Sequence, residues 1–251
     1  LDGTINSINI GKGANSVANN TVLGENALDA SVTGDHNTAL GKDALTTNTS
    51  GSKNNAIGFQ SLRLTTTGSK NEAIGYLALT ENTSGSNNIG IGDEALQNNT
   101  TANDNTAVGR QALKLNTTGA NNVALGSNAL DANTTASNNI AIGFNCLGVN
   151  TTGTQNVAVG SFALDANQTG GNNVAVGYNS LSASTGDDNT GVGLNALRKT
   201  TSGVQNTGIG NRCLEENTTA SNNTGLGYKA LYVNTTGTGN VAVGSNALDA
   251  N

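Results

Sequence analysis

Apolar and polar residues follow one another along this chain in a unit that recurs every 17 residues. Its clearest marker is a glycine preceded by an aliphatic residue and, before that, a small one. Successive markers are 17 residues apart from Gly24 to Gly177, 16 apart to Gly193, and 17 apart again to Gly244. Counted from an asparagine four residues before this glycine, position 4 is aliphatic, position 8 is Ala, Ser or Cys, and position 9 is leucine. A fixed period of this kind is typical of repeat architectures.

Each unit carries the signals of strands and turns. Positions 2 to 4 are rich in β-branched residues of alternating size, which predicts a short strand. The glycine at position 5 permits a positive φ or a close backbone approach, and positions 8 and 9 are expected to begin a second strand. Positions 12 to 15 read mostly Asn-Thr-Thr-Gly, which is turn chemistry. Two strands and two turns per unit, or rung, predict an all-β fold, a parallel β-solenoid of about 14 rungs.

The repeat also predicts how the chain is divided. Residues 1–19 are expected to be an N-terminal lead-in with one short rung. Residues 20–251 are expected to form the array of 17-residue rungs, the last of which is truncated. The lack of a leading methionine indicates an excerpt or a processed product.

Position 1 is asparagine in every rung. Identical amides stacked one rung apart can hydrogen-bond along the stack, as asparagine ladders do in cross-β structures. The alternative is that asparagine tolerates a left-handed turn conformation at this point. We expect a structural ladder made of Asn20, Asn37, Asn54, Asn71, Asn88, Asn105, Asn122, Asn139, Asn156, Asn173, Asn189, Asn206, Asn223 and Asn240.

Positions 3 and 8 hold small residues in every rung except at Val22. Because neighbouring residues of a strand point to opposite faces, we expect these columns to face away from an aliphatic interior built by positions 4 and 9. A free surface would tolerate bulk and charge there. The restriction therefore predicts that other copies of the chain pack against these columns in a homotrimer. The alternative is that the small columns pack inside a monomer.

Several segments resemble a known family of surface proteins. Residues 9–14 (Asn-Ile-Gly-Lys-Gly-Ala), 37–41 (Asn-Thr-Ala-Leu-Gly) and 240–248 (Asn-Val-Ala-Val-Gly-Ser-Asn-Ala-Leu) resemble the head repeats of YadA-like trimeric autotransporter adhesins. The longer unit with its Asn-Thr-Thr-Gly insert is similar to repeats of phage tail-fibre and bacterial surface proteins. The resemblance covers residues 7–251 and implies a left-handed β-roll in a trimeric fibre, outside the cell or on a virion. It brings no catalytic motif, and the 17-residue period is longer than that of the adhesin heads.

Composition and charge narrow the functional classes. The 251 residues include 34 Gly, no Pro, Met or Trp, and only 3% aromatic residues, so the chain lacks the large side chains that fill a compact enzyme. The formal net charge of −6 argues against a nucleic-acid surface, which needs clustered Lys and Arg. No apolar run approaches the length needed to span a membrane, so we expect no membrane insertion.

Aromatic residues are the main candidates for a binding surface. Six of the seven lie at positions 6 and 7 of the rung, several on adjacent rungs. Exposed rings in a row can stack on sugars or bind an apolar patch of a receptor. They can equally cover a turn or fill a groove between subunits. The six candidates are Phe59, Tyr76, Phe144, Phe162, Tyr178 and Tyr228.

Catalytic and metal-binding chemistry finds little support in the sequence. His36 is the only histidine and has no fixed partner in the repeat, whereas a catalytic triad needs a base held by a carboxylate. Cys146 and Cys213 both occupy position 8, four rungs apart and beyond disulfide reach, and we interpret them as small packing residues. Aspartates are too few per rung for a calcium-binding β-roll. We therefore expect no enzyme, no metal and no cofactor.

Two features of the Asn-Thr-Thr-Gly segment leave alternatives open. A file of threonine hydroxyls could contact ice, although adjacent residues of an extended chain point in opposite directions and turn chemistry explains the segment as well. The segment also contains nine Asn-x-Thr/Ser sequons at position 12, Asn82 and Asn150 among them. These would carry glycans only on a glycosylating secretory route.

Together these observations favour a non-enzymatic, fibrous attachment protein. The chain would be the shaft or the receptor-facing segment of a phage tail fibre or bacterial surface adhesin, located extracellularly on a cell surface or a virion. Its expected partners are two further copies of itself and a cell-surface glycan or protein receptor. The alternative is an extracellular structural or ice-binding β-solenoid.

Overall fold

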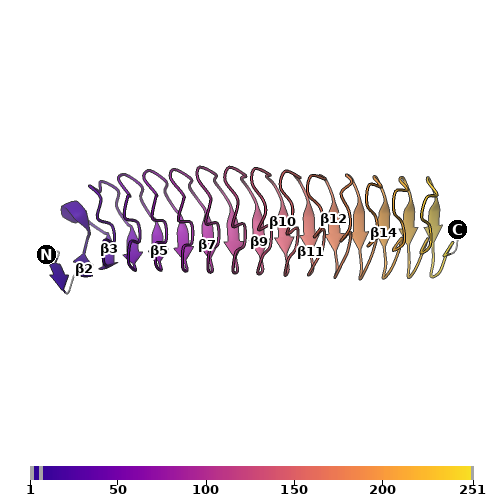
Figure 1. The fold of residues 1–251 in the computed structure, drawn as a ribbon, viewed down its shortest axis with the longest axis horizontal. Coiled ribbons are helices and arrows are strands. Elements are labelled where there is room, and N and C mark those ends of the chain that lie inside the picture. Colours follow the sequence, from indigo (N-terminus) through magenta and orange to yellow (C-terminus); the bar gives the residue numbers. More distant parts are fainter. Residues whose placement is uncertain (1–2, 6–7, 250–251) are drawn as a thin grey trace. The chain divides into compact units, whose positions relative to one another are not determined.

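The computed structural model describes residues 3–5 and 8–249. The fold is all-β, a parallel β-solenoid of about 13 turns with a 17-residue period (Figure 1). The chain divides into two compact units, Leu1–Asn122 and Val123–Asn251, here called unit 1 and unit 2. Each is described by itself.

Unit 1 begins with antiparallel strands and continues as a parallel stack. Strand β1 pairs antiparallel with β2, and β2 pairs antiparallel with β3. From β3 to β8 every pairing is parallel and joins equivalent positions of the repeat, as between Ala56 and Ala73. The elements are β1 (Gly3–Ile5), β2 (Ile8–Gly11), the short 3-10 helix η1 (Ala14–Ser16), β3 (Thr21–Gly24), β4 (Thr38–Leu40), β5 (Asn55–Ile57), β6 (Glu72–Ile74), β7 (Ile89–Ile91) and β8 (Thr106–Val108).

Unit 2 consists of parallel rungs in the same register. The 16-residue rung keeps this register, since Val174 of β12 pairs with Thr190 of β13 and Leu181 remains fully buried. The missing residue therefore shortens a loop and leaves the interior in phase. The strands are β9 (Val123–Leu125), β10 (Ile140–Ile142), β11 (Val157–Val159), β12 (Val174–Val176), β13 (Thr190–Val192), β14 (Thr207–Ile209), β15 (Thr224–Leu226) and β16 (Val241–Val243).

Each rung contains one strand, at positions 2 to 4, and the expectation of a second strand at positions 8 and 9 is wrong. Those positions lie in a tight turn in which position 7 and the leucine at position 9 have positive φ, for example 56° at Glu94 and 51° at Leu96. A left-handed conformation costs an ordinary L-residue about 1–2 kcal/mol. Burial of a leucine side chain stabilises by about 1.5–3 kcal/mol. Burying Leu96 completely is therefore enough to offset the strain at Leu96 itself.

The small columns line the interior, and the expectation that they face outward is wrong. Ala107 at position 3 is 0% exposed, whereas Val108 at position 4 is 37% exposed. Strand alternation holds, but the inward face is the small one because the coil is narrow. A Cβ added at Gly90 would lie 3.2 Å from side-chain atoms of Leu79. The structure instead agrees with the alternative, in which these columns pack inside one chain. The small columns therefore give no reason to expect a second copy.

The marker glycine is required on two counts. From Gly41 to Gly244 its φ lies between 130° and 144°, a range that L-residues rarely adopt. The rungs also approach closely here, since a Cβ on Gly92 would lie 2.5 Å from the carbonyl oxygen of Gly109. This position therefore fixes both the corner of the rung and the distance to the next one.

Candidate functional site

The outward side chains of the strands form an exposed surface that we call the outer sheet face, defined as positions 2 and 4 of the rungs. In unit 2 these positions hold only Val, Ile, Leu and Thr from β9 to β16. In unit 1, from β3 to β8, Glu72 is the one charged member. Exposed aliphatics include Ile74 and Ile91 in unit 1 and Ile142 and Ile209 in unit 2. Exposed apolar patches of this kind mark contact surfaces.

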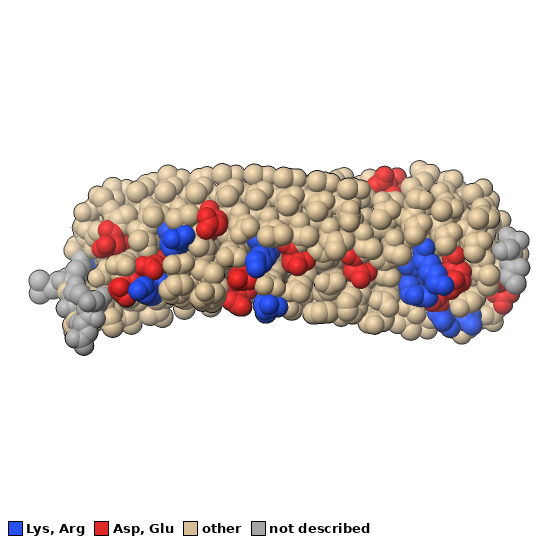
Figure 2. All heavy atoms as spheres, viewed as in Figure 1, with Lys and Arg blue, Asp and Glu red and all other residues tan. Residues whose placement is uncertain are grey.

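Charged side chains other than Glu72 lie outside the strands that form this face from β3 to β16. Figure 2 shows a mostly uncharged face on which Lys and Arg lie beside Asp and Glu in small groups. Several groups are pairs between neighbouring rungs, such as Lys42 with Glu25 at 3.0 Å and Lys114 with Glu94 at 2.7 Å. The hydrogen bond from Lys114 to Glu94 lowers the pKa of that carboxyl group below its ordinary value.

Five of the six candidate aromatic residues lie in two short rows, and all of these are exposed except Phe162, which is partly buried. In unit 1, the rings of Phe59 and Tyr76 stack at 5.4 Å with an interplanar angle of 11°, and 37% and 52% of these residues is exposed. In unit 2, Phe162 makes edge contacts with Phe144 at 5.4 Å and with Tyr178 at 6.0 Å. The rings therefore contact each other across rungs, and each row also presents apolar surface to its surroundings.

Tyr228, the sixth candidate, belongs to a different arrangement, the cationic–aromatic cluster of Arg212, Tyr228, Lys229 and Tyr232. Lys229 Nζ lies 5.5 Å from the ring centroid of Tyr228 and 4.9 Å from that of Tyr232. Arg212 Cζ lies 5.5 Å from the same Tyr232 centroid. Tyr232 lies at position 10, outside positions 6 and 7, where the other six aromatic residues lie. The signal available was a pair of tyrosines at positions 6 and 10 of one rung with a lysine between them.

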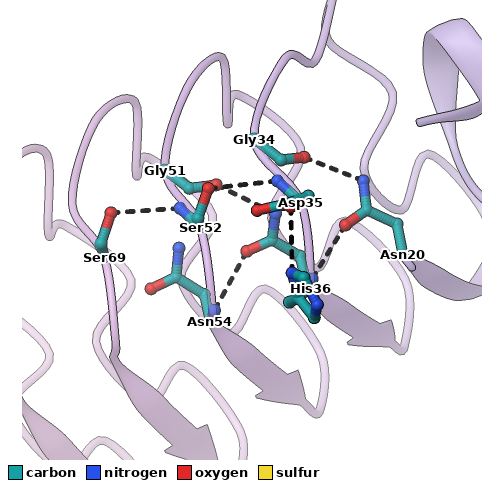
Figure 3. Close-up of polar contacts among 9 residues, drawn as sticks. Asn20, Gly34, Asp35, His36, Gly51, Ser52, Asn54 and Ser69 are labelled. Carbon is teal, nitrogen blue, oxygen red and sulfur yellow. Dashed lines mark hydrogen bonds and ion pairs between the residues drawn. The ribbon is translucent and has the colours of Figure 1, made fainter. Parts of the chain in front are cut away.

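The asparagines of position 1 form a buried ladder (Figure 3). The backbone N–H of Asn37 donates to Asn20 Oδ1 at 2.8 Å, and that of Asn54 donates to Asn37 Oδ1 at 3.0 Å. In most rungs the side-chain Nδ2 also closes its own rung by donating to the carbonyl of position 15, as Asn20 does to Gly34 at 3.0 Å. The column therefore ties neighbouring rungs together and closes most rungs on themselves.

A second buried ladder lies at position 12. From the sequence, these asparagines were predicted only to form a turn and to belong to glycosylation sequons. Asn99 Nδ2 donates to Asn82 Oδ1 at 2.9 Å, and Asn116 Nδ2 donates to Asn99 Oδ1 at 2.9 Å. These three side chains are fully buried, as is Asn150. A glycan is attached through this same nitrogen, so these sequons are inaccessible in the folded chain.

The threonines of position 13 bind the neighbouring rung. Thr66 Oγ1 donates to the carbonyl of Thr83 at 3.1 Å, and Thr83 Oγ1 donates to that of Thr100 at 3.0 Å. The same bond recurs in unit 2, as between Thr201 and Thr218. Hydroxyl hydrogens engaged in this way are not free to donate to water or ice, so this column has a structural role.

The lone histidine has a carboxylate beside it but lacks the order of a catalytic triad. His36 Nδ1 lies 3.0 Å from Asp35 Oδ2, and both side chains are about half exposed. The hydrogen bond from His36 lowers the pKa of Asp35. Ser52 Oγ accepts from the backbone N–H of Asp35 at 3.1 Å (Figure 3). In a triad the histidine lies between nucleophile and acid, whereas here Asp35 lies between Ser52 and His36.

The two cysteines are free and buried. Burial raises the pKa of Cys146 to about 12 and that of Cys213 to about 11, so both are protonated thiols at neutral pH. Cys146 Sγ donates to the carbonyl of Ala158. Among residues 3–5 and 8–249, no group of three His, Cys, Asp or Glu could hold a metal ion. None of the helices in the described part of the chain has the length and apolarity that a membrane crossing requires.

In comparisons with known proteins, no family model matches the chain and no curated protein matches its sequence. The surface features described above, namely the outer sheet face, the aromatic rows and the cationic–aromatic cluster, are the candidates for a functional role.

Proposed function

We propose that this chain is a non-enzymatic segment of a homotrimeric attachment fibre, the shaft or receptor-facing part of a phage tail fibre or bacterial surface adhesin. It acts outside the cell, on a cell surface or a virion. The observation that carries the proposal is the outer sheet face, which leaves aliphatic side chains such as Ile142 and Ile209 exposed in a single chain. A second copy that covers this face would remove them from water.

The size of the face supports self-association. In unit 2, eight strands about 4.8 Å apart make a stripe about 34 Å long, and two outward side chains per strand make it about 10 Å wide. A patch of roughly 300 Å² on one unit is comparable to the largest apolar patches of ordinary monomers, which are often functional. In a cyclic oligomer every chain turns the same face to the axis. The choice of three copies comes from the resemblance to trimeric adhesin heads.

Attachment is supported by the aromatic rows. The exposed rings of Phe59 and Tyr76 offer flat apolar surface to a glycan or protein receptor on a cell. If these rings instead fill grooves between subunits, replacing them changes the oligomer and not the binding. Replacing Tyr76 and Tyr178 with serine should lower retention of the labelled chain on receptor-bearing cells while its mass in solution stays unchanged.

The assembly is tested by light scattering on a sizing column. We expect a mass about three times 25.0 kDa. Lysines placed on the outer sheet face of unit 1 (Ile74→Lys, Ile91→Lys and Val108→Lys together) should give a monomer with an unchanged circular dichroism spectrum. The matched control puts the same charges on exposed turn residues (Ser84→Lys, Thr101→Lys and Thr118→Lys) and should remain trimeric. A monomeric wild-type chain would overturn the trimer.

A second candidate function is an extracellular structural or ice-binding β-solenoid. It is favoured by the outer sheet face of unit 2, where two in-register columns of Val, Ile, Leu and Thr form a regular array. Here the outward residues of the strands, and not the threonines of position 13, would meet ice. An ice binder should shape growing ice crystals as isolated protein. Three lysines placed on the outer sheet face of unit 2 (Ile142→Lys, Val159→Lys and Val176→Lys) should abolish this effect.

A further inference from the structure

We propose that the cationic–aromatic cluster of Arg212, Tyr228, Lys229 and Tyr232 is a binding site for an acidic sugar whose ring carries a carboxylate. The inference rests on the attachment function proposed above and deepens it, because it names the ligand class that one surface of unit 2 holds. All four residues belong to unit 2.

The first step is the position of Lys229. Its ammonium group lies against two tyrosine rings, at 5.5 and 4.9 Å from their centroids. Within the described residues it forms no ion pair with a carboxylate, unlike Arg198, Lys199 and Arg212 of the same unit. Cation–π contacts hold the side chain in place while leaving its positive charge uncompensated. A carboxylate ligand supplies the missing counter-ion without any rearrangement of the lysine.

The second step is the local charge. Glu215, only 1% exposed, accepts from Arg198 at 2.8 Å and from Arg212 at 2.6 Å, and Lys199 binds Glu216 at 2.6 Å. With Lys229, four cations lie near the carboxylates of Glu215, Glu216 and, one rung beyond Tyr232, Asp249, which leaves one positive charge in this region of a chain whose net charge is −6. Figure 2 shows Lys and Arg gathered in this way over the later rungs of unit 2. Such an island attracts an anion locally.

The third step is the departure from the repeat. Arg212 and Lys229 both occupy position 7, in consecutive rungs, where six other rungs of the chain have asparagine. Like charges stacked on neighbouring rungs repel each other. Glu215 forms an ion pair with Arg212 and not with Lys229. An anion bound at Lys229 would reduce the repulsion between the two cations.

The fourth step is the choice of a sugar. Tyr228 is 46% exposed, so its ring offers a flat apolar surface beside the ammonium group. A pyranose ring that carries a carboxylate matches this pair, since its C–H face packs on the tyrosine while its carboxylate reaches Lys229. This small net charge is too little for a nucleic-acid strand, which needs a basic stripe of several phosphate contacts. The acidic remainder of the chain repels such polyanions further.

The test uses the full chain and a hyaluronan hexasaccharide as probe, with the same oligosaccharide reduced at its carboxylates as the neutral control. We expect calorimetric binding to the acidic probe alone. Lys229→Gln should weaken this binding about tenfold, which corresponds to one charge-assisted contact of about 1.4 kcal/mol. The matched control, Lys199→Gln, removes the same charge from the same region but from a residue without an aromatic contact, and its binding should stay within about twofold of wild type.

The outcomes separate this inference from the attachment function. Equal binding of the acidic and neutral probes, or a Lys229→Gln variant that binds as tightly as wild type, overturns the acidic-sugar site. Equal weakening in both variants, with equal binding of a poly-aspartate peptide, shows a general charge effect and also overturns it. In each case the chain can still be trimeric and bind cells, so attachment stands. A chain that is monomeric and binds no cells fails as an attachment fibre, and then the inference falls with it.

Discussion

Asn37 and Asn48 donate their side-chain Nδ2 hydrogens to the same carbonyl oxygen, that of Gly51, at 2.9 and 3.0 Å. Both side chains are fully buried, and the pattern recurs in other rungs, as at Asn71 and Asn82 with Gly85. A carbonyl oxygen has two lone pairs, so each amide uses one. Two interior amides thus close the rung at a single point, which makes the polar interior a determinant of the fold.

The ladder of position 1 should be costly to interrupt. In Asn71→Ala, the backbone N–H of Asn88 loses its acceptor at 3.0 Å and the carbonyl of Gly85 loses one of its donors. A buried polar group left without a partner costs about 1–3 kcal/mol. We expect the free energy of unfolding in urea to fall by about this amount. The control Thr101→Ala alters an exposed side chain and should leave the urea midpoint in place; an equal loss in both variants would contradict a specific role for the ladder.

The narrow interior predicts opposite responses at two consecutive residues. Ala107→Leu adds bulk to a fully buried position, and overpacking of this kind costs about 1–3 kcal/mol. Val108→Leu adds one methylene group to an exposed position of the outer sheet face and should change stability by less than about 0.5 kcal/mol. Thermal unfolding of the two variants measures the difference. If Val108→Leu were the more destabilising change, the assignment of inner and outer faces would be wrong.

The marker glycine should tolerate no side chain. Gly92→Ala forces φ of 135° on an alanine and puts its Cβ 2.5 Å from the carbonyl oxygen of Gly109. The backbone strain and the displaced rung together should cost more than about 3 kcal/mol. Gly3→Ala is the control, because nothing lies within 4 Å of the added Cβ. Urea unfolding of both proteins checks the prediction, and a Gly92→Ala variant as stable as the control would refute the close approach.

The buried thiols predict a loss of stability at alkaline pH. Burial raises the pKa of Cys146 to about 12 and that of Cys213 to about 11, from 9.0 in an exposed thiol. Above pH 9 the unfolded chain loses these protons before the folded chain does, so stability present below pH 9 falls as the pH rises towards 11 and 12. Urea midpoints measured from about pH 8 to about pH 10.5 should fall more for wild type than for a Cys146→Ala/Cys213→Ala variant.

That double variant also serves as the structural control, since alanine occupies position 8 in neighbouring rungs such as those of Ala129 and Ala163. Its stability at neutral pH should be close to that of wild type. Parallel pH profiles of the two proteins would show that the thiols do not titrate on unfolding in this range.

Sequence periodicity predicted the all-β solenoid and its 17-residue period, because every rung repeats the same strand, corner glycine and buried leucine. It could not predict which face of the strand points inward. Strand alternation shows that Ala107 and Val108 lie on opposite faces, but it does not show which face is buried. The rule that larger aliphatic residues are buried wrongly favoured Val108 as the interior residue. Only the narrowness of the coil, a property of the closed rung, decides in favour of alanine.

The turn at positions 7 to 9 could not be predicted from the sequence either. Leucine has no intrinsic preference for positive φ, so Leu96 gave no sign that it lies in a corner and not in a strand. The contact of Phe59 with Tyr76 followed from the period, since both lie at position 6 of adjacent rungs. The period did not predict the contacts of Phe162, which lies at position 7 whereas Phe144 and Tyr178 lie at position 6. The contact of Lys229 with Tyr232 joins positions 7 and 10 across a turn whose geometry the sequence did not define.

The rung-to-rung hydrogen bonds described above have a mechanical consequence. Because each rung bonds only to its neighbours, a pulling force within a unit passes through the rungs in series, and the least stable rung opens first. One released rung of 17 residues supplies about 55 Å of extended chain in place of a spacing of about 4.8 Å. A tether built in this way lengthens in large steps under load while the remaining rungs stay intact, and it dissipates energy at each step.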